Sequence, residues 1–232
     1  MKIVIRLPMS DLAEGERALD AGQVRYVSRV HRLHVGDRFV AFDPTNAVEC
    51  DAEILSARRV RLGKCRPSAT TAMREITWVH GCPKGDKADA IVRDATELGA
   101  TRIVFVPTTR SVARPSPTRV ERWVRIAREA ARQCNRGDAP EVILAPTWEE
   151  ALQGIDAETR VCLDPRGEPL HAVLSRATGA LAFAAGPEGG FTEAELDAAR
   201  TRNFVLCRLG SFVMRTETAP AAVLGAVALL AP

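Results

Sequence analysis

Aromatic residues and lysine are scarce in this chain of 232 residues. Phenylalanine, tryptophan and tyrosine together make up 5% of it, and lysine supplies only 4 of the 32 basic residues. A platform that stacks the successive bases of a single-stranded nucleic acid presents several aromatic rings, so this composition does not support one. The arginine bias is a property of the whole chain, and part of it is expected to be solvated surface.

Long apolar runs are absent as well. The longest one, residues 219–232, contains two prolines and is shorter than the roughly 20 residues that a membrane-spanning helix needs. The opening segment, MKIVIRLPMS, has too short an apolar stretch and no cleavage pattern for a secretory signal. We therefore expect a cytoplasmic protein that does not enter a membrane. Residues 219–232 are expected to form a buried C-terminal helix or a helix at a subunit contact.

The cysteines form no C-x-x-C pair, and no cluster of histidines accompanies them. A zinc site or a disulfide framework is therefore not expected, and no metal is predicted. Most of the cysteines are instead predicted to be small buried side chains. Cys134 has no histidine nearby in sequence to activate it, which argues against a nucleophile. The six positions are Cys50, Cys65, Cys82, Cys134, Cys162 and Cys207.

Charge is distributed unevenly along the chain. Residues 1–67 hold 12 basic and 9 acidic side chains, residues 68–140 hold 13 and 8, and residues 141–232 hold 7 and 12. Basic charge in residues 1–140 and acidic charge in residues 141–232 suit a protein whose first 140 residues bind a polyanion and whose last third binds a small ligand. A solvated, arginine-rich surface remains the alternative explanation of the basic part.

The first 66 residues are predicted to be a small β-rich, barrel-like module. Short strands are expected at residues 2–7, 38–42, 48–57 and 59–62, with a hairpin turn at residues 43–46. Residues 23–33 alternate basic and apolar side chains, which predicts a helix that presents Arg25, Arg29 and Arg32 along one side. The polar, proline-containing stretch at residues 65–72 is the natural linker.

Strands and helices alternate from residue 73 onward, which predicts a mostly parallel α/β sheet with helices on both faces. A helix at residues 86–98 should end at Gly99, and another should begin at Ser116-Pro117 and reach about residue 133. Thr147 with Glu150, and Thr192 with Glu195, fit the capping box at two later helix starts. Strands are expected at residues 75–80, 102–106, 159–163, 180–185 and 203–208.

Two loops of this second part contain the most specific motifs. GPEGGF at residues 186–191 follows one short apolar strand, and LGSFVMRTETA at residues 209–219 follows another. Loops at the carboxyl ends of neighbouring strands in an open α/β sheet converge on the crevice where ligands bind. One glycine-containing loop would be weak support for a site, but two with this spacing, the second carrying Arg-Thr-Glu-Thr, are specific.

These two loops resemble the SPOUT class of RNA methyltransferases, and within it the family that methylates N3 of a uridine in 16S ribosomal RNA. Further matching motifs are VHRLHVGD at residues 30–37, KGD at 84–86, TELG at 96–99, Arg110-Ser111, and QCNRGDAP at 133–140. The resemblance implies a PUA-like β-barrel at residues 1–66 and a SPOUT domain at residues 73–232 whose trefoil knot holds S-adenosylmethionine. It also implies a homodimer and 16S ribosomal RNA, or the small ribosomal subunit, as the partner.

The resemblance implies roles for residues in both loops. Arg215 is expected to stabilise the anion that develops on uracil when the N3 proton leaves, and Glu217 to accept that proton. The glycines could instead be turn residues only, and Arg215 could pair with Glu217 structurally. Residues expected to bind the cofactor are Leu163, Gly186, Pro187, Glu188, Gly189, Gly190, Leu209, Gly210, Ser211, Val213, Met214, Arg215 and Thr218.

A second set of residues is expected to contact RNA. As a set these side chains would bind phosphates, which position a nucleic acid without reading its sequence. Each one alone could equally be a solvated surface residue. The set comprises Arg6, Arg29, Arg32, Lys84, Arg110, Gln133 and Arg136.

Two positions depart from the family's pattern. Phe212 stands where such loops usually carry an additional arginine, and Asp94 replaces a lysine. Both differences remove positive charge from the expected active face, so two alternatives stay open. One is a SPOUT methyltransferase acting on a ribose 2′-hydroxyl or another base, and the other is a non-catalytic RNA-binding assembly protein. A dinucleotide-dependent oxidoreductase is excluded because no G-x-G-x-x-G opens a helix after a strand.

Overall fold

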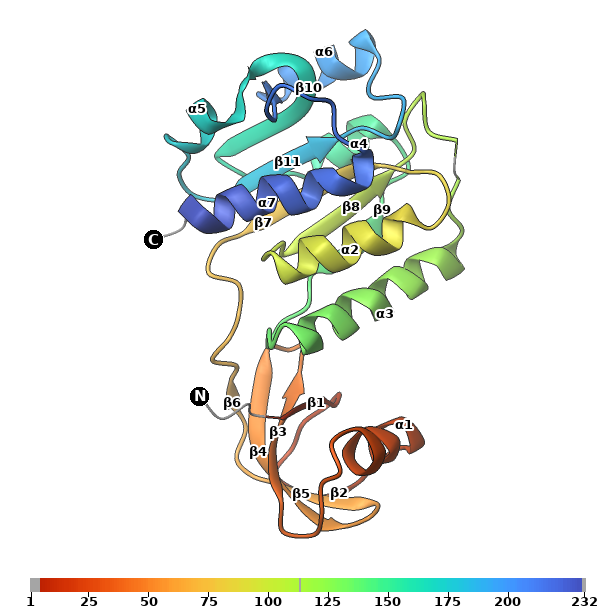
Figure 1. Cartoon of the computed structure of the whole chain (residues 1–232), viewed down its shortest axis with the longest axis vertical. Coiled ribbons are helices and arrows are strands. Elements are labelled where there is room, and N and C mark those ends of the chain that lie inside the picture. Colours follow the sequence, from red (N-terminus) through yellow and green to blue (C-terminus); the bar gives the residue numbers. More distant parts are fainter. Residues whose placement is uncertain (1–4, 113, 231–232) are drawn as a thin grey trace. The chain divides into compact units, whose positions relative to one another are not determined.

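The computed structural model describes residues 5–112 and 114–230, which divide into two compact units (Figure 1). One unit contains the chain up to Thr71 together with Ala131–Ala139, and the other contains the remaining residues. The segment Ala131–Ala139 begins with the last residues of the helix Pro117–Gln133, whose remaining residues belong to the second unit. The predicted domains, residues 1–66 and 73–232, had placed this segment in the second.

The first unit is built on a six-stranded sheet with the strand order β1-β3-β4-β5-β2, and β6 pairs with β4. β1 and β3 are parallel, whereas the other pairs are antiparallel. Apolar residues alternate along β4 and β5, so that one face supplies the core of the unit. Of the strand expected at residues 2–7, residues 2–4 lie outside the described part. The strands are β1 (Arg6–Pro8), β2 (Gly15–Ala18), β3 (Arg38–Asp43), β4 (Val48–Ser56), β5 (Arg59–Leu62) and β6 (Arg66–Pro67).

The hairpin between β3 and β4 turns at the predicted residues. The Asp43 carboxylate accepts hydrogen bonds from the backbone N–H of Thr45 (2.9 Å) and from the side chain of Asn46 (2.8 Å). Burial raises the pKa of Asp43, but these hydrogen bonds outweigh it and hold the pKa below its usual value. The turn is therefore organised by one buried carboxylate.

The helix expected at residues 23–33 is shorter than predicted and begins earlier. Asp20 caps its start by accepting the backbone N–H of Gln23 (2.8 Å), so α1 comprises Ala21–Arg25. A π-helical turn follows at Tyr26–Val30, and Arg32 then adopts the left-handed conformation with φ +52°. Because Arg32 lies beyond the helical end, the expected row of three arginines along one helix side is wrong.

The second unit contains a six-stranded sheet in which every pair is parallel, as predicted. Its strand order is β12-β10-β11-β7-β8-β9. The sequence pattern missed β9, a four-residue edge strand. The strands are β7 (Ile76–Gly81), β8 (Arg102–Val106), β9 (Glu141–Leu144), β10 (Thr159–Pro169), β11 (Leu181–Ala185) and β12 (Val205–Arg208).

Helices cover both faces of this sheet, which confirms the layered α/β prediction. The larger core packs α2, α3, α5 and α7 against one face around Trp78, Phe105 and Phe183. Figure 1 shows α2 and α7 crossing in front of the strands. The smaller core packs α4 and α6 against the other face around Val104 and Phe191. The helices are α2 (Lys87–Glu97), α3 (Pro117–Gln133), α4 (Trp148–Gln153), α5 (Leu170–Leu174), α6 (Glu193–Thr201) and α7 (Ala219–Leu230).

Local sequence signals predicted most of these helix ends correctly. Thr192 and Glu195 form the predicted capping box of α6, with each side chain bonded to the backbone of the other residue. At α4, the Thr147 side chain accepts the backbone N–H of Glu150 (3.2 Å). Gly99 follows α2 with φ +94°, the left-handed conformation expected after a helix end.

The strands that precede the two motif loops are not neighbours, contrary to expectation. β10 lies between β11 and β12 and pairs with both. The pairing of β10 with β12 shifts register between Leu163 and Glu168, and the loop-like bulge that this leaves within β10, residues 164–167, therefore lies between the two predicted loops. Three strand ends, rather than two, converge at this edge of the sheet.

Two further expectations concern the burial of the cysteines and the absence of a membrane-spanning helix. Cys50, Cys82, Cys162 and Cys207 are fully buried, as predicted for most of the cysteines. Within residues 5–112 and 114–230, no helix combines the length and the apolar character that a bilayer crossing requires.

Candidate active site

A cavity of about 670 Å³ opens at the carboxyl ends of β10, β11 and β12. Its volume is in the range of small-molecule sites. Every predicted cofactor residue except Thr218 lines it, from Leu163 through the GPEGG loop to Arg215. Glu217, the predicted proton acceptor, does not line it. Lining residues that sequence reasoning did not name are Asp164, Pro165, Arg166, Ala185, Phe191, Glu193, Cys207, Arg208, Thr216 and Ala219.

The GPEGG loop folds tightly on itself and on the end of β7. The backbone N–H of Gly190 donates to the carbonyl of Pro187 (2.8 Å), and Gly190 has φ +68°, a conformation that favours glycine. A Cβ atom at Gly81 would lie 2.5 Å from the Pro187 ring. Only a glycine at the end of β7 therefore lets the loop approach this closely.

A buried hydrogen-bond chain joins β7 to both loops. The indole N–H of Trp78 donates to His80 Nδ1 (3.0 Å), and His80 Nε2 lies 2.8 Å from Thr216 Oγ1. The Thr216 hydroxyl then donates to the carbonyl of Gly186 (2.6 Å). Because an indole N–H can only donate, the neutral imidazole carries its proton on Nε2 and donates it to Thr216. The second loop is thus held against the first.

The His80 imidazole in this series of hydrogen bonds does not titrate near neutral pH. His80 is fully buried, and burial lowers its pKa to about 3, opposed by the negative charge of Glu188. Its role is therefore that of a fixed neutral donor. The sequence contains one signal for this contact, the threonine inside Arg-Thr-Glu-Thr, but nothing in it connects that threonine to His80.

A lysine at the start of α2 bridges the two loops. Lys87 Nζ lies 2.7 Å from Glu188 Oε1 and 3.3 Å from Glu217 Oε2, and the backbone N–H of Lys84 also donates to Glu188 (3.1 Å). The hydrogen bond to Glu188, followed by that to Glu217, raises the pKa of Lys87. Burial raises the pKa of Glu188, but the hydrogen bonds from Lys87 and from the backbone outweigh burial, so the pKa of Glu188 is lowered overall. Glu217 is thus paired with Lys87 and not with Arg215.

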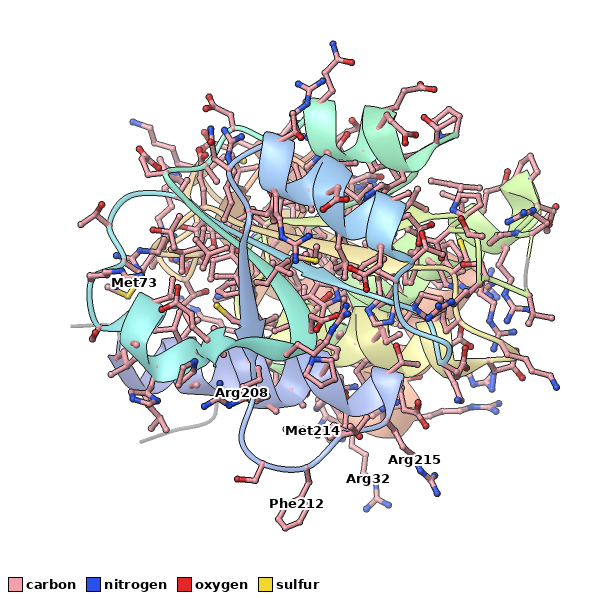
Figure 2. All side chains as sticks on the ribbon, turned by 90° about the horizontal axis from the view of Figure 1, so that it is seen from above. Arg32, Met73, Arg208, Phe212, Met214 and Arg215 are labelled. Carbon is pink, nitrogen blue, oxygen red and sulfur yellow. The ribbon has the colours of Figure 1, made fainter. Side chains whose placement is uncertain are left out.

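Three of the arginines that line the cavity have no carboxylate partner among the described residues. Arg110 donates to the carbonyl of Gly189 (2.7 Å), and Arg208 to the carbonyl of Gly167 (2.6 Å). The Arg215 side chain is exposed and makes neither a hydrogen bond nor an ion pair to any residue that the structure describes. Figure 2 shows its side chain extending away from the loop. A guanidinium so placed is available for a ligand.

Comparison with known proteins identifies the family. Residues 70–228 match the family model described as RNA methyltransferase domain. This chain belongs to that family of RNA methyltransferases.

Relatives of this RNA methyltransferase extend the similarity to most of the chain. The ribosomal RNA small subunit methyltransferase E of Synechocystis sp. is 30% identical over 223 residues, covering 93% of this chain and 74% of the relative. The protein of the same name from Bacillus subtilis is 30% identical over 222 residues, covering 88% and 86%. The crystal structure of the Neisseria gonorrhoeae enzyme of that name, bound to S-adenosyl methionine, superposes with a TM-score of 0.86 at 28% identity, covering 98% of both chains.

The methyltransferase domain contributes one loop that sequence reasoning missed. Asp164 accepts hydrogen bonds from the backbone N–H (2.8 Å) and the Nε (3.0 Å) of Arg166, which also pairs with Glu193. The bond to Arg166 is the main cause that lowers the pKa of Asp164. The strand-end rule that found the other two loops would have found this one, had β10 been placed between β11 and β12.

A capping residue positions the loop that carries Arg110. Glu195 Oε1 accepts the backbone N–H of Thr109 (2.7 Å), while Oε2 accepts the backbone N–H of Thr192 (2.8 Å). Thr192 is the N-cap of α6, so one buried carboxylate joins this helix to the loop after β8. Arg110 is thereby held at the edge of the cavity.

The residues expected to bind RNA divide into buried and exposed groups. Arg6 is 9% exposed and forms an ion pair with Glu49 (2.9 Å), and Arg136 is 8% exposed and pairs with Asp138 (2.7 Å). A buried arginine requires such a partner, so both lie in the interior of the first unit and not on its surface. The exposed residues of the set are Arg29, Arg32, Lys84, Arg110 and Gln133.

Metal ligands are not gathered in this domain or elsewhere among the described residues. Within residues 5–112 and 114–230, no three His, Cys, Asp or Glu side chains lie together in a way that could hold a metal ion.

Proposed function

We propose that this RNA methyltransferase transfers a methyl group from S-adenosylmethionine to N3 of a uridine in 16S ribosomal RNA. The observation that carries the proposal is the cavity in which both motif loops meet, with the unpartnered guanidinium of Arg215 on its lining. The similar proteins of Synechocystis and Bacillus subtilis are named for the small-subunit RNA, and the similar Neisseria structure holds S-adenosyl methionine.

The residues of the cavity fit this methyl donor. Leu163, Ala185 and Leu209 supply apolar walls for a planar adenine, and the glycines leave backbone groups open for its polar edge. S-adenosylmethionine, when bound, supplies an electrophilic methyl group on a sulfonium centre. Among the lining residues, the carboxylate of Asp164 is held in place by Arg166 and is suited to ligand hydroxyl or ammonium groups.

Arg215 supplies the chemistry that a uridine N3 nucleophile needs. Negative charge spreads onto the uracil oxygens as the N3 proton leaves, and a positioned guanidinium stabilises it. Arg215 is N-terminal to the turn that Thr216 anchors through His80, so its backbone is fixed while its side chain extends freely. This combination suits binding of a substrate that arrives from solution.

Glu217 was expected to accept the N3 proton. Its ion pair with Lys87 (3.3 Å) keeps it outside the cavity lining, so an acceptor role requires that pair to open. A positioning role, in which Glu217 and Glu188 fix the two loops through Lys87, requires no movement. We propose the positioning role as the principal one.

For the whole molecule we propose a PUA-like barrel in the first unit, a trefoil knot formed by the C-terminal strands of the second, and a cytoplasmic homodimer. The end of α7 supports the dimer, because Leu229 is 87% and Leu230 59% exposed, and such apolar ends are usually covered. The exposed residues Arg29, Arg32, Lys84, Arg110 and Gln133 would contact RNA phosphates.

The decisive experiment uses small ribosomal subunits, and free 16S RNA, from cells that lack this gene. The purified protein with isotopically labelled S-adenosylmethionine should label one uridine, and mass spectrometry of nucleosides should identify 3-methyluridine. Labelling of a ribose 2′-hydroxyl instead would overturn the assignment of N3. If the protein binds the donor but labels neither RNA substrate, the proposed function is wrong.

A further inference from the structure

The loop between β12 and the Arg-Thr-Glu-Thr turn exposes three large apolar side chains, of which Met214, at 38%, is the least exposed. Phe212 is 88% exposed and Val213 82%, although phenylalanine is among the residues most often buried in proteins. Both residues line the cavity. In Figure 2 the Phe212 ring projects away from the loop into open space. This exposed ring therefore stands beside the entrance to the proposed methyl-donor site.

The charged groups around this ring leave an excess of positive charge. Each of the three carboxylates that line the cavity is ion-paired: Asp164 and Glu193 share Arg166, and Glu188 shares Lys87 with Glu217. Four arginines line the cavity against these three carboxylates, which leaves an excess of one positive charge. Among the described residues, the arginines of the lining that have no carboxylate partner are Arg110, Arg208 and Arg215. An aromatic face beside such arginines matches a planar ring that is attached to an anionic backbone.

We propose that Phe212 forms a base-binding subsite, in which an unstacked base flanking the target nucleotide of the RNA stacks on the ring. The inference rests on the proposed function and adds to it the residue that receives a neighbouring base. The flanking base is the occupant because the reacting base must enter the cavity, whereas Phe212 is almost fully exposed at its edge. Arg208 and Arg215 supply positive charge for the adjoining phosphates.

A single exposed ring is consistent with the low aromatic content of the chain. It cannot form a platform for a long single strand, but one ring is enough for one base that has been splayed out of its stack. Proteins that modify a base inside a folded RNA must unstack it, and this leaves the flanking bases without a partner on one side. Phe212 would replace that lost stacking partner.

A second copy of the chain is the other occupant that the ring could meet. The arginines that surround the ring argue against it, since a two-fold contact would bring the same positive patches of both copies together. The exposed leucines at the end of α7 offer an apolar surface without such charges. RNA therefore fits the surroundings of Phe212 better than a protein partner does.

The test compares Phe212→Ala with Phe212→Trp, and uses Met73→Ala as the matched control. Met73 is 89% exposed, does not line the cavity, and lies on another side of the molecule from Phe212 in Figure 2. The full-length protein is assayed with its ribosomal substrate under steady-state conditions. Phe212→Ala should raise the KM for RNA about tenfold, on the scale of losing one base–aromatic stack. The KM for RNA should change by a much larger factor than kcat or the Kd for S-adenosylmethionine, and Phe212→Trp should retain the wild-type KM.

A fluorescent base provides an independent measurement that does not need turnover. With 2-aminopurine placed on either side of the target in an RNA fragment, binding of the wild type and of Phe212→Trp should quench one of the two positions. Phe212→Ala should leave that position unquenched. Because this readout needs only binding, it still tests the subsite if the wild type fails to methylate, which would contradict the proposed function alone.

Two results would overturn the subsite. One is Phe212→Ala behaving like Met73→Ala in both the KM and the quenching measurement. The other is a change in the mass measured by light scattering for Phe212→Ala, with an unaltered KM for RNA, which would assign the ring to a subunit contact.

Discussion

His80 Nε2 lies 2.8 Å from Thr216 Oγ1, and this contact joins residues 136 positions apart in the chain. The imidazole is completely buried and already accepts the Trp78 indole N–H, so its second nitrogen has one fixed role, that of donor to Thr216. The Thr216 hydroxyl in turn donates to Gly186. The shape of the proposed donor site therefore depends on a neutral histidine outside both motif loops.

The neutral state of His80 predicts how stability depends on pH. Its pKa is about 3 in the folded protein, below its ordinary value of 6.5, so between these values the unfolded chain binds the additional proton. The contribution of His80 to stability is fully present above pH 6.5 and is lost as the pH falls below it, by up to about 1.4 kcal/mol per pH unit. Unfolding by urea at pH 5 to 6.5 should show this loss for the wild type and a smaller one for His80→Gln. Equal slopes in both proteins would contradict the prediction.

Removal of the Thr216 hydroxyl should loosen the contact between the two loops. Thr216→Val leaves the His80 N–H and the Gly186 carbonyl without a partner, which costs about 1–3 kcal/mol for each buried group. We expect a lower melting temperature and weaker binding of S-adenosylmethionine in calorimetry. Thr216→Ser retains the hydroxyl and should behave like the wild type. If Thr216→Val binds the donor normally, the hydrogen-bond chain does not shape the site.

Arg215→Ala should affect the chemical step more than binding. The side chain has no partner among the described residues, so its removal leaves no buried group unsatisfied and the fold should persist. Loss of one preorganised charge stabiliser typically lowers kcat by about 10²–10³. Single-turnover methylation at saturating RNA and donor measures this directly, with calorimetry as the control for donor affinity. A wild-type rate would assign the uracil charge to another cation of the cavity, such as Arg208.

Local sequence signals predicted much of the fold, because they act over a few residues. The β8 strand at Arg102–Val106 is a short apolar run, and α3 begins at the proline of the Ser116-Pro117 pair. The two glycine-containing loops were found by the same local reasoning, and nearly all of their expected cofactor residues line one cavity. Structural features that depend only on residues close together in the chain can therefore be predicted from the sequence.

Long-range placement could not be predicted in this way. Position 6 is a basic residue near the start of a strand, and nothing local to it shows that Glu49 will bury and neutralise it. The insertion of β10 between β11 and β12 is likewise a property of topology. Because the sequence does not show this insertion, the segment at Asp164 was not predicted to line the site. The bridging role of Lys87 also depends on contacts with Glu188 and Glu217, which lie 101 and 130 positions further along the chain.

The difference between buried and exposed arginines predicts two classes of variant in the first unit. Arg6→Ala removes the buried ion-pair partner of the Glu49 carboxylate, which keeps its second ion pair, to the exposed Arg66 (3.3 Å). Breaking a buried pair costs about 3–5 kcal/mol when the remaining charge is left uncompensated, so we expect a smaller cost here. We expect a loss of stability in denaturant unfolding. Arg32→Ala removes an exposed side chain and should leave stability unchanged. It should instead weaken RNA binding and reduce its salt dependence by roughly one counterion, measured by titration at several salt concentrations. Similar effects of both variants on stability would contradict the assignment.

Glu217→Gln and Lys87→Met together decide whether Glu217 moves a proton or positions a loop. The 3.3 Å ion pair between these residues ties the second loop to α2, and Lys87 also holds Glu188 of the first loop at 2.7 Å. If Glu217 only positions, Glu217→Gln weakens the attachment of the second loop, whereas Lys87→Met releases Glu188 of the first loop as well. Both variants should then weaken binding of S-adenosylmethionine, Lys87→Met more strongly, with kcat at saturation little changed. A general base contributes about 10²–10⁴ to the rate and gives the pH profile an acidic limb. A large loss of kcat and of that limb in Glu217→Gln, with Lys87→Met retaining both, would show that the carboxylate leaves Lys87 and accepts the proton.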